Sequence, residues 1–189
     1  MENLKKYKII LGSGSPRRRE LLAGLGFDFE VKNINTDESY PAELSGEKIP
    51  VFLANKKSQA FDIQLNELLI TADTIVLLDD KVIGKPTDDA DAKNILRELS
   101  GKVHKVISGV CLRTINKRRI FSAASQVKFA KLTDKEIDFY IENYRPFDKA
   151  GAYGIQEWIG FVAVEWIRGS FYNIMGLPIQ QLYTELKTM

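Results

Sequence analysis

The stretch "YKIILGSGSPRRRELLAGL", residues 7–25, forms the first corner of the predicted fold. Residues 7–11 predict a short strand, and residues 18–25 predict a helix because their apolar side chains recur at helical spacing. Ser15 is a good helix N-cap, and Pro16 suits the first helical position. Such a strand–loop–helix corner presents free backbone N–H groups and the positive end of a helix dipole, which attract an anion. An ordinary capped helix with solvated arginines gives the same pattern, so the corner alone leaves both interpretations open.

Length and composition narrow the class of protein. The 189 residues are enough for one domain with a sizeable core. Because 27 Lys and Arg nearly balance 25 Asp and Glu, the overall charge gives no broad attraction to nucleic acid. Cys111 and His104 are the only residues of their types, which excludes disulfide frameworks, structural zinc sites and catalytic machinery that needs a second histidine. The chemistry must therefore rest on Asp, Glu, Lys and Arg.

We expect no signal peptide in the N-terminal sequence. Residues 1–8 are charged and lead into a five-residue apolar run, which is too short for a signal peptide. No apolar stretch approaches the length of a membrane span. We therefore expect a cytoplasmic protein without a membrane or nucleic-acid partner.

Strand and helix patterns follow one another along the chain without a steady β–α–β alternation. This order favours a mixed α/β sheet over a doubly wound parallel sheet, in a single domain of residues 1–189. Asp88, Asp89 and Asp91 fit the first turn of a helix capped by Thr87, so they are interpreted as structural carboxylates rather than metal ligands. The expected strands are 27–34, 68–78, 81–83, 103–112, 119–129 and two short ones through Ile167 and Ile174. The expected helices are 50–61, one after Thr87, one from the capping box Thr133–Glu136 to about Asn143, and one after Pro178.

Asp73 breaks the local pattern, because it lies within "LLITADTIVLL", residues 68–78, the most apolar strand of the sequence. A buried carboxylate costs several kcal/mol unless it is paired or bound to a metal. One interpretation is a salt bridge in the core. The other is a carboxylate at a strand break that holds a divalent cation or activates water.

Lys57 and its neighbour Lys56 differ in helical phase. At about 100° per residue, Lys57 falls between Leu53 and Ala60 on the apolar face, whereas Lys56 falls toward the flank. We therefore expect Lys57 to point toward the sheet. The alternative is that its side chain runs along the edge of the core and reaches water.

Cationic side chains recur at rigid or inward-facing positions. Lys85 lies between Gly84 and Pro86, which hold the backbone extended, so its side chain projects from a rigid corner. His104 lies on a predicted strand, where a structural role is favoured over a catalytic one. Five cations beside a few carboxylates resemble a polyphosphate site, in which cations neutralise phosphates while carboxylates hold a metal and orient water. The five cations are Arg17, Arg18, Lys57, Lys85 and Lys149, the last of these beside Asp148.

An ordered series of short motifs resembles the Maf family of nucleoside triphosphate pyrophosphatases over nearly the whole chain. The resemblance implies a mixed α/β fold of the inosine-triphosphatase-like type, with two lobes and a central cleft, often as a homodimer. It also implies metal-dependent hydrolysis of a nucleoside triphosphate to the monophosphate and pyrophosphate. The motifs are Ser13-Gly14-Ser15-Pro16-Arg17-Arg18, Leu53-Ala54 with Lys57, Ala72-Asp73-Thr74, Gly84-Lys85-Pro86, Leu99-Ser100-Gly101 with His104, Asp148-Lys149-Ala150-Gly151-Ala152-Tyr153-Gly154-Ile155-Gln156 and Gly176-Leu177-Pro178.

The resemblance also assigns roles to residues that match the family pattern. Asp73 matches the catalytic carboxylate, and Glu38 matches an acidic partner for metal or water. Arg17, Thr74 and Gln156 match the positions associated with base choice in the branch acting on dTTP and UTP. One difference from the family is "EWIG", residues 157–160, where relatives often have a glycine-rich run. Together with the charge pattern, the resemblance predicts substrate contacts at Ser13, Arg17, Arg18, Lys57, Lys85, Asp148 and Lys149.

The resulting hypothesis is an enzyme that hydrolyses dTTP and UTP, with Mg²⁺ or Mn²⁺ held by Glu38 and Asp73. Water is expected to attack the α-phosphorus while the cations stabilise the pyrophosphate that leaves. The alternative is a nucleotide-binding regulator of septum formation and cell division without significant turnover. Asp73 and Lys85 argue against this alternative, because a protein that only binds nucleotides has little need of a carboxylate facing phosphates.

Overall fold

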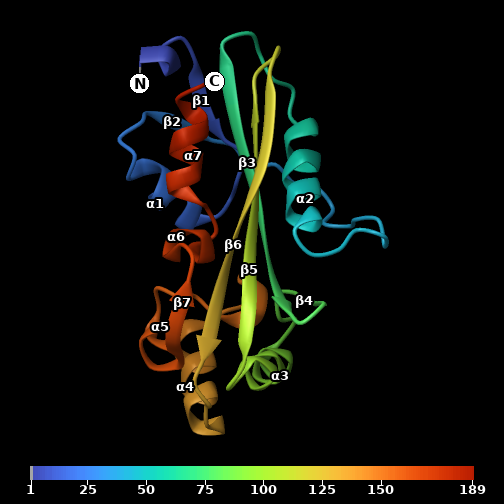
Figure 1. Ribbon diagram of the computed structural model, residues 1–189, viewed down its shortest axis with the longest axis vertical. Coiled ribbons are helices and arrows are strands. Elements are labelled where there is room, and N and C mark those ends of the chain that lie inside the picture. The colour runs from blue at the N-terminus through green and yellow to red at the C-terminus, as the bar shows by residue number, and fades with distance from the viewer. Residues whose placement is uncertain (1) are drawn as a thin grey trace. The chain divides into compact units, whose positions relative to one another are not determined.

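A mixed sheet forms the centre of the structure, a computed structural model that describes residues 2–189 (Figure 1). Its strands are β1 (Lys8–Leu11), β2 (Phe29–Val31), β3 (Glu67–Leu78), β4 (Lys81–Ile83), β5 (Val103–Arg113), β6 (Arg118–Phe129) and β7 (Val164–Arg168). The strand order is β2-β1-β3-β5-β6-β7, and β4 pairs with β3. Strand β1 is parallel to β2 and β3, whereas β4 is antiparallel to β3 and β7 is antiparallel to β6. The predicted mixed sheet is therefore confirmed.

The helices occupy most of the remaining chain. They are α1 (Pro16–Ala23), α2 (Lys48–Gln59), α3 (Asp89–Leu99), α4 (Asp134–Tyr144), α5 (Trp158–Ala163), α6 (Phe171–Met175) and α7 (Ile179–Leu186), with short 3-10 helices at Glu2–Leu4 and Ala150–Ala152. Among residues 2–189, no helix combines the length and the apolar character that crossing a membrane requires.

The chain divides into two compact units. Unit 1 comprises the residues up to Thr74 together with Ser108–Ala123 and Gly176–Met189, and unit 2 comprises Ile75–Ile107 and Ala124–Met175. Strands β3, β5 and β6 each contribute residues to both units.

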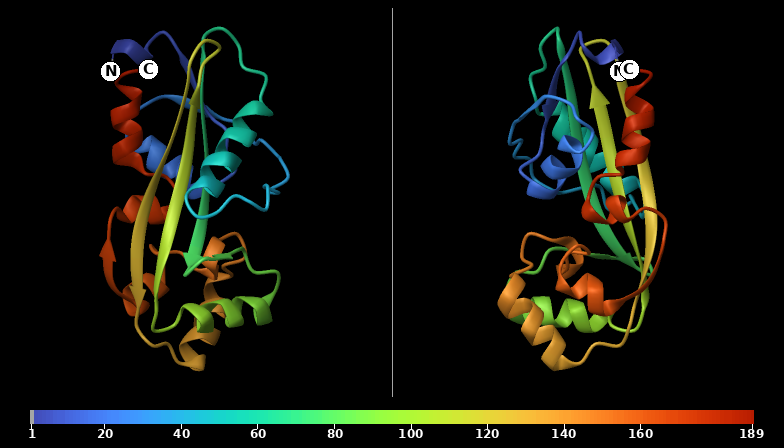
Figure 2. Two further views of the ribbon diagram at one scale, coloured as in Figure 1. Left: turned by 45° about the vertical axis from the view of Figure 1, so that its right-hand side comes forward. Right: turned by 90° about the vertical axis from the view of Figure 1, so that its left-hand side faces the viewer.

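Unit 1 contains the corner that the opening stretch predicts. Ser15 caps α1, and its side chain accepts a hydrogen bond from the Arg18 N–H at 3.5 Å. Helix α2 packs very closely on β5, because a Cβ at Gly109 would lie 2.3 Å from the Pro50 carbonyl carbon. The first described residues lie beside α7, where Asn3 Nδ2 donates to the Leu186 carbonyl oxygen at 2.9 Å (Figure 2).

Unit 2 is built around the paired helices α3 and α4 (Figure 2). Two ion pairs join them: Lys93 Nζ lies 2.6 Å from Asp138 Oδ1, and Arg97 Nε lies 2.8 Å from Asp134 Oδ1. The capping box at the start of α4 is present as predicted, with the Thr133 and Glu136 side chains bonded to each other's backbone N–H groups.

Two local expectations are wrong. The N-cap of α3 is Asp88 rather than Thr87, because the Asp88 carboxylate accepts from the Asp91 N–H at 2.8 Å. Ile174 lies on helix α6 rather than on a strand. The Ser170 hydroxyl accepts from the Asn173 N–H at 3.4 Å and so caps this short helix, which alternation of polar and apolar residues does not reveal.

Candidate active site

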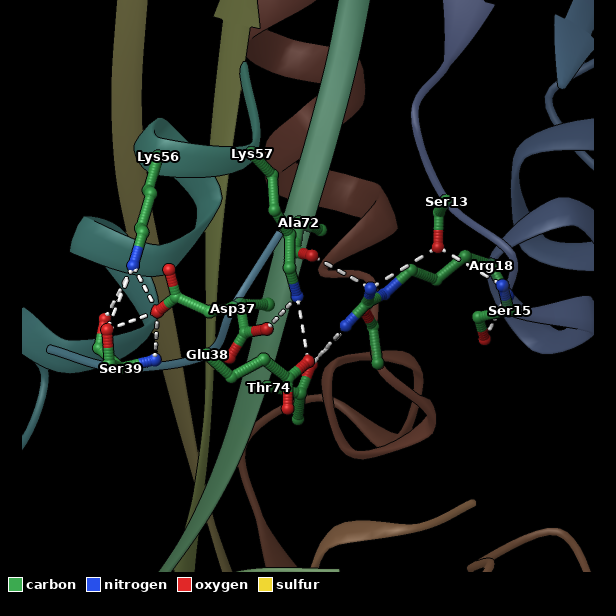
Figure 3. Close-up of polar contacts among 12 residues, drawn as sticks. Ser13, Ser15, Arg18, Asp37, Glu38, Ser39, Lys56, Lys57, Ala72 and Thr74 are labelled. Atoms are coloured by element: carbon green, nitrogen blue, oxygen red, sulfur yellow. Dashed lines mark hydrogen bonds and ion pairs between the residues drawn. The ribbon is translucent and has the colours of Figure 1, made fainter. Parts of the chain in front are cut away.

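The Lys57 ammonium joins two carboxylates in unit 1. Lys57 lies on α2, Asp73 on β3, and Glu38 in the loop that precedes α2. Lys57 Nζ is 2.5 Å from Asp73 Oδ1 and 3.2 Å from Glu38 Oε1. Lys57 and Glu38 are labelled in Figure 3. Asp73 is only 6% exposed, and the Lys57 ammonium is the ion-pair partner that a buried carboxylate requires. Three of the predicted site residues are therefore in contact.

The adjacent lysines of α2 take different partners, as their helical phase predicts. The side chain of Lys57 is 12% exposed and that of Lys56 is 28% exposed. Lys56 Nζ lies 2.6 Å from Asp37 Oδ1 and donates to the Ser39 carbonyl oxygen at 3.0 Å (Figure 3). Bonds from Lys56 and Ser39 hold the pKa of the Asp37 carboxyl well below its usual range. Two neighbouring carboxylates, Asp37 and Glu38, are thus bonded to two neighbouring lysines.

Asp37 and Lys56 are not among the predicted site residues. The signal that points to them is local: an acidic dipeptide in a polar loop is matched by a basic dipeptide on the next helix. Because the ion pair of Asp37 holds the loop beside Glu38, it contributes to the position of the Glu38 carboxylate.

The Arg18 side chain makes four hydrogen bonds within unit 1. Its Nε donates to the Gly176 carbonyl oxygen at 2.8 Å, and Nη1 donates to the Ala72 carbonyl oxygen at 2.8 Å and to Ser13 Oγ at 3.4 Å. Its Nη2 donates to Thr74 Oγ1 at 3.1 Å (Figure 3). A guanidinium has five N–H groups, so most of its donors serve to join α1 to β3 and to the segment before α7. Burial lowers the pKa of Arg18, and the charge of Asp73 opposes this effect.

Thr74 receives one of these bonds and also lies 2.8 Å from Ser108 Oγ. Thr74 Oγ1 accepts a hydrogen bond from Arg18, and its own proton can be donated to the Ser108 hydroxyl or to the Gly176 carbonyl oxygen at 3.4 Å. Arg17 precedes Arg18 on α1 and is partly buried. The structure therefore brings Ser13, Arg18 and Thr74 together by direct hydrogen bonds.

The predicted residues of unit 2 gather around the loop that follows α4. Lys149 is 8% exposed, and its Nζ lies 2.7 Å from Asp148 Oδ1 and 3.1 Å from Glu157 Oε1. The Gly151 N–H donates to the Gly84 carbonyl oxygen at 3.0 Å, which ties the corner carrying the exposed Lys85 to this loop.

Gln156 ends the same loop. Its Oε1 atom is buried and, within residues 2–189, has no hydrogen-bond partner. A buried acceptor without a donor is costly, so the amide is suited to a ligand that offers an N–H group.

His104 has the surroundings of a structural histidine. It is 1% exposed, its Nε2 lies 2.8 Å from the Tyr153 hydroxyl, and its ring packs edge-on against Phe129 and Tyr153. Burial lowers the pKa of His104 to about 4, so the imidazole is neutral at pH 7.

The pair of Glu38 and Asp73 has the chemistry of a magnesium or manganese site. Carboxylate oxygens are the ligands that hard divalent cations prefer, and the two carboxylates converge on one positive group, the Lys57 ammonium. Within residues 2–189, no group of three or more His, Cys, Asp and Glu side chains is arranged to hold a metal. The arrangement therefore fits a cation that takes one or two protein carboxylates and completes its coordination with phosphate and water.

Comparison with known proteins first defines the class of fold. A solved structure of a HAM1 protein from Coxiella burnetii is similar with a TM-score of 0.52 and 15% sequence identity, and the similarity covers 97% of this chain and 100% of that chain. This likeness confirms the predicted mixed α/β fold of the inosine-triphosphatase-like type.

The family follows from the sequence comparisons. The family model described as "Maf-like protein" matches residues 8–189, so the chain belongs to the Maf family. It is 56% identical over 192 residues to a dTTP/UTP pyrophosphatase from Phocaeicola vulgatus, and the match covers 100% of both chains. It is 56% identical over 190 residues to a protein of the same name from Bacteroides thetaiotaomicron, covering 99% of this chain and 98% of the relative.

Proposed function

We propose that this chain is a nucleoside triphosphate pyrophosphatase that hydrolyses dTTP and UTP to the nucleoside monophosphate and pyrophosphate. The observation that carries the proposal is the buried Asp73 carboxylate, which shares the Lys57 ammonium with Glu38. A carboxylate can accept the proton of an attacking water, and the ammonium beside it can neutralise charge on a phosphate. The names of the similar relatives from Phocaeicola vulgatus and Bacteroides thetaiotaomicron agree with this activity.

The reaction joins a water oxygen to the α-phosphorus and breaks the bond from that phosphorus to the α–β bridging oxygen. Asp73 takes the proton of the attacking water, and Lys57 neutralises negative charge on the phosphates as pyrophosphate leaves. A divalent cation, Mg²⁺ or Mn²⁺, held by Glu38 and Asp73 would supply further charge neutralisation and lower the pKa of the water.

The base preference rests on Gln156 together with Arg17, because a flipped Gln156 amide alone would also suit cytosine whereas a guanidinium only donates. The buried Oε1 of Gln156 is suited to accept the N3–H of uracil or thymine, and its amide N–H groups are suited to donate to O4. Cytosine reverses both groups, because its N3 accepts and its amino group donates. Arg17 and Thr74 are the other two residues to which the family resemblance gives a role in base choice.

The remaining assignments follow from the family resemblance and the charge pattern. Ser13, Arg17, Arg18, Lys85, Asp148 and Lys149 are proposed as substrate contacts. For Arg18 the proposal is limited to the one donor that its internal hydrogen bonds leave. We further propose that residues 1–189 act as one domain in the cytoplasm. We also propose that the protein forms a homodimer, and light scattering on the purified protein tests this oligomeric state.

Product analysis tests the proposed reaction. Incubation with dTTP should give dTMP and pyrophosphate, a chelator should abolish turnover, and added Mg²⁺ or Mn²⁺ should restore it. Formation of dTDP and orthophosphate as the main products would contradict attack at the α-phosphorus. Tight binding of dTTP without hydrolysis would instead favour a regulator.

A further inference from the structure

The segment that carries Gln156 is held in one conformation by very close contacts. A Cβ at Gly154 would lie 2.6 Å from Glu157 Cδ, and a Cβ at Gly160 would lie 1.8 Å from the Ile155 carbonyl oxygen. The Glu157 N–H donates to the Gly154 carbonyl oxygen at 2.9 Å, which closes a tight turn around Gln156. A side chain at position 160 would collide with the backbone, and one at position 154 would displace the Glu157 carboxylate, so the segment packs closely on both sides of Gln156.

A buried hydroxyl from another element links the two sides of this turn. Tyr140 on α4 is fully buried, and its hydroxyl accepts from the Gly154 N–H at 2.9 Å. The same hydroxyl donates to Glu157 Oε2 in a short hydrogen bond. Gly154 and Glu157 flank Gln156, so the Tyr140 hydroxyl bridges the residues on either side of it.

The Glu157 carboxylate is held by both of its oxygens. Oε2 accepts from Tyr140, and Oε1 lies 3.1 Å from Lys149 Nζ. Lys149 is itself bonded to Asp148 at 2.7 Å. The carboxylate cannot rotate without losing either the hydroxyl or the ammonium. Burial and the neighbouring carboxylate raise the pKa of Tyr140, so the phenol keeps the proton that it donates.

We propose that Tyr140 and Glu157 are positioning residues for base selection, because together they fix the backbone on both sides of Gln156. This inference rests on the proposed function, in which Gln156 reads the base. An amide can satisfy uracil in one orientation and cytosine in the flipped orientation, and the backbone does not set which of the two it takes. The contacts of Tyr140 and Glu157 fix the position from which the Gln156 side chain reaches the base, whereas a mobile segment lets the amide shift toward either base.

The test compares two tyrosines of the same helix. Tyr140→Phe removes the bridging hydroxyl, and Tyr144→Phe removes an exposed hydroxyl from the ring that stacks on Tyr140 at 5.2 Å. We expect Tyr140→Phe to lower the ratio of kcat/KM for UTP to that for CTP by about tenfold, and Tyr144→Phe to leave it unchanged. The values of kcat/KM for both nucleotides are measured at a temperature well below the melting temperature of each variant.

Glu157→Gln provides a second variant of nearly the same size. It replaces one of the two acceptor oxygens with an NH₂ group and removes the negative charge. Either the Tyr140 hydroxyl or the Lys149 ammonium then faces the NH₂ group instead of an acceptor. We expect the same fall in the ratio. The double variant Tyr140→Phe/Glu157→Gln should show little further change, because the two side chains act through one hydrogen bond.

The outcomes separate a positioning role from general destabilisation. A variant that is only less stable loses activity toward UTP and CTP equally, and an unchanged ratio in both Tyr140→Phe and Glu157→Gln would overturn the inference. Gln156→Ala is measured in parallel. If it changes the ratio while the other two variants do not, the positioning role alone is wrong. If Gln156→Ala also leaves the ratio unchanged, the proposed base reading is wrong and the inference falls with it.

Discussion

At the residue scale, the candidate site combines two carboxylates with one ammonium. Glu38 and Asp73 share Lys57, and the Arg18 guanidinium is a second cation that feels the charge of Asp73. The proposed divalent cation would therefore bind beside carboxylates that protein cations already compensate in part. The Lys57 ammonium gives the buried Asp73 carboxylate a partner of opposite charge.

Asp73→Asn should lower turnover by about a hundredfold or more, because an amide does not accept the proton of the attacking water and is a weak metal ligand. Removal of an isolated buried charge would raise stability, but the contact with Lys57 changes this expectation. The variant leaves the ammonium with a weaker partner, so we expect stability to fall by about 1–2 kcal/mol. Steady-state kinetics and urea denaturation measure the two effects.

The control for this change is Asp79→Asn. Asp79 is an exposed carboxylate just after the same strand and has a positive φ of 53°, which asparagine tolerates. It should retain both activity and stability. Near-normal turnover in Asp73→Asn would reduce Asp73 to a structural member of a core salt bridge.

At the scale of elements, α2 presents adjacent lysines on two different surfaces. Lys57 reaches the buried Asp73 on β3, whereas Lys56 holds the loop through Asp37 and Ser39 (Figure 3). Arg113 on β5 anchors the end of the same helix, because its Nη1 donates to the Ser58 carbonyl oxygen at 2.5 Å. Helix α2 is therefore attached both to the loop and to β5.

Replacing the two lysines one at a time tests this division of roles. Lys57→Ala should reduce kcat strongly, because it removes a phosphate contact and leaves Asp73 buried without its partner. Lys56→Ala should change activity by less than about twofold, since partly exposed ion pairs contribute at most about 1 kcal/mol. The measurement is kcat and KM for dTTP in both variants. Equal losses would mean that the Lys56 contacts with the loop are as important as the buried pair.

At the scale of the whole molecule, acid should weaken the fold through His104. Burial lowers the pKa of this histidine from 6.5 to about 4, so between these two values the unfolded chain binds more protons than the folded chain. The contribution of neutral His104 to the free energy of unfolding therefore has its full value, up to about 3 kcal/mol, above about pH 6.5. This contribution is lost as the pH falls from 6.5 toward 4.

The variant His104→Phe isolates this contribution. It should be less stable at pH 7.5, because the Tyr153 hydroxyl loses its partner, but its stability should depend less on pH between 7 and 5. Titrating carboxylates contribute to both proteins and cancel in the comparison. Urea denaturation at several pH values measures the slopes, and identical slopes would show that His104 does not control the acid sensitivity.

Some features of this protein follow from the sequence alone because their causes are local. The Ser15 cap and the capping box Thr133–Glu136 join residues three apart, and the phase of Lys57 depends only on its own helix. The mixed sheet follows from the order of the elements. Short elements such as α6 escape these rules, because a few residues carry too little periodicity to identify a helix.

Other features depend on residues that are far apart in the sequence, and only the tertiary structure decides them. Arg18 bonds the carbonyl oxygen of Gly176, and the Tyr140 hydroxyl bridges the turn around Gln156. The sequence shows that Arg18 is a cation and that Glu157 is an anion, but it does not show what either side chain touches. A guanidinium or a carboxylate satisfies its hydrogen bonds with whichever groups the fold brings near, so its role is set by packing rather than by neighbours in the chain.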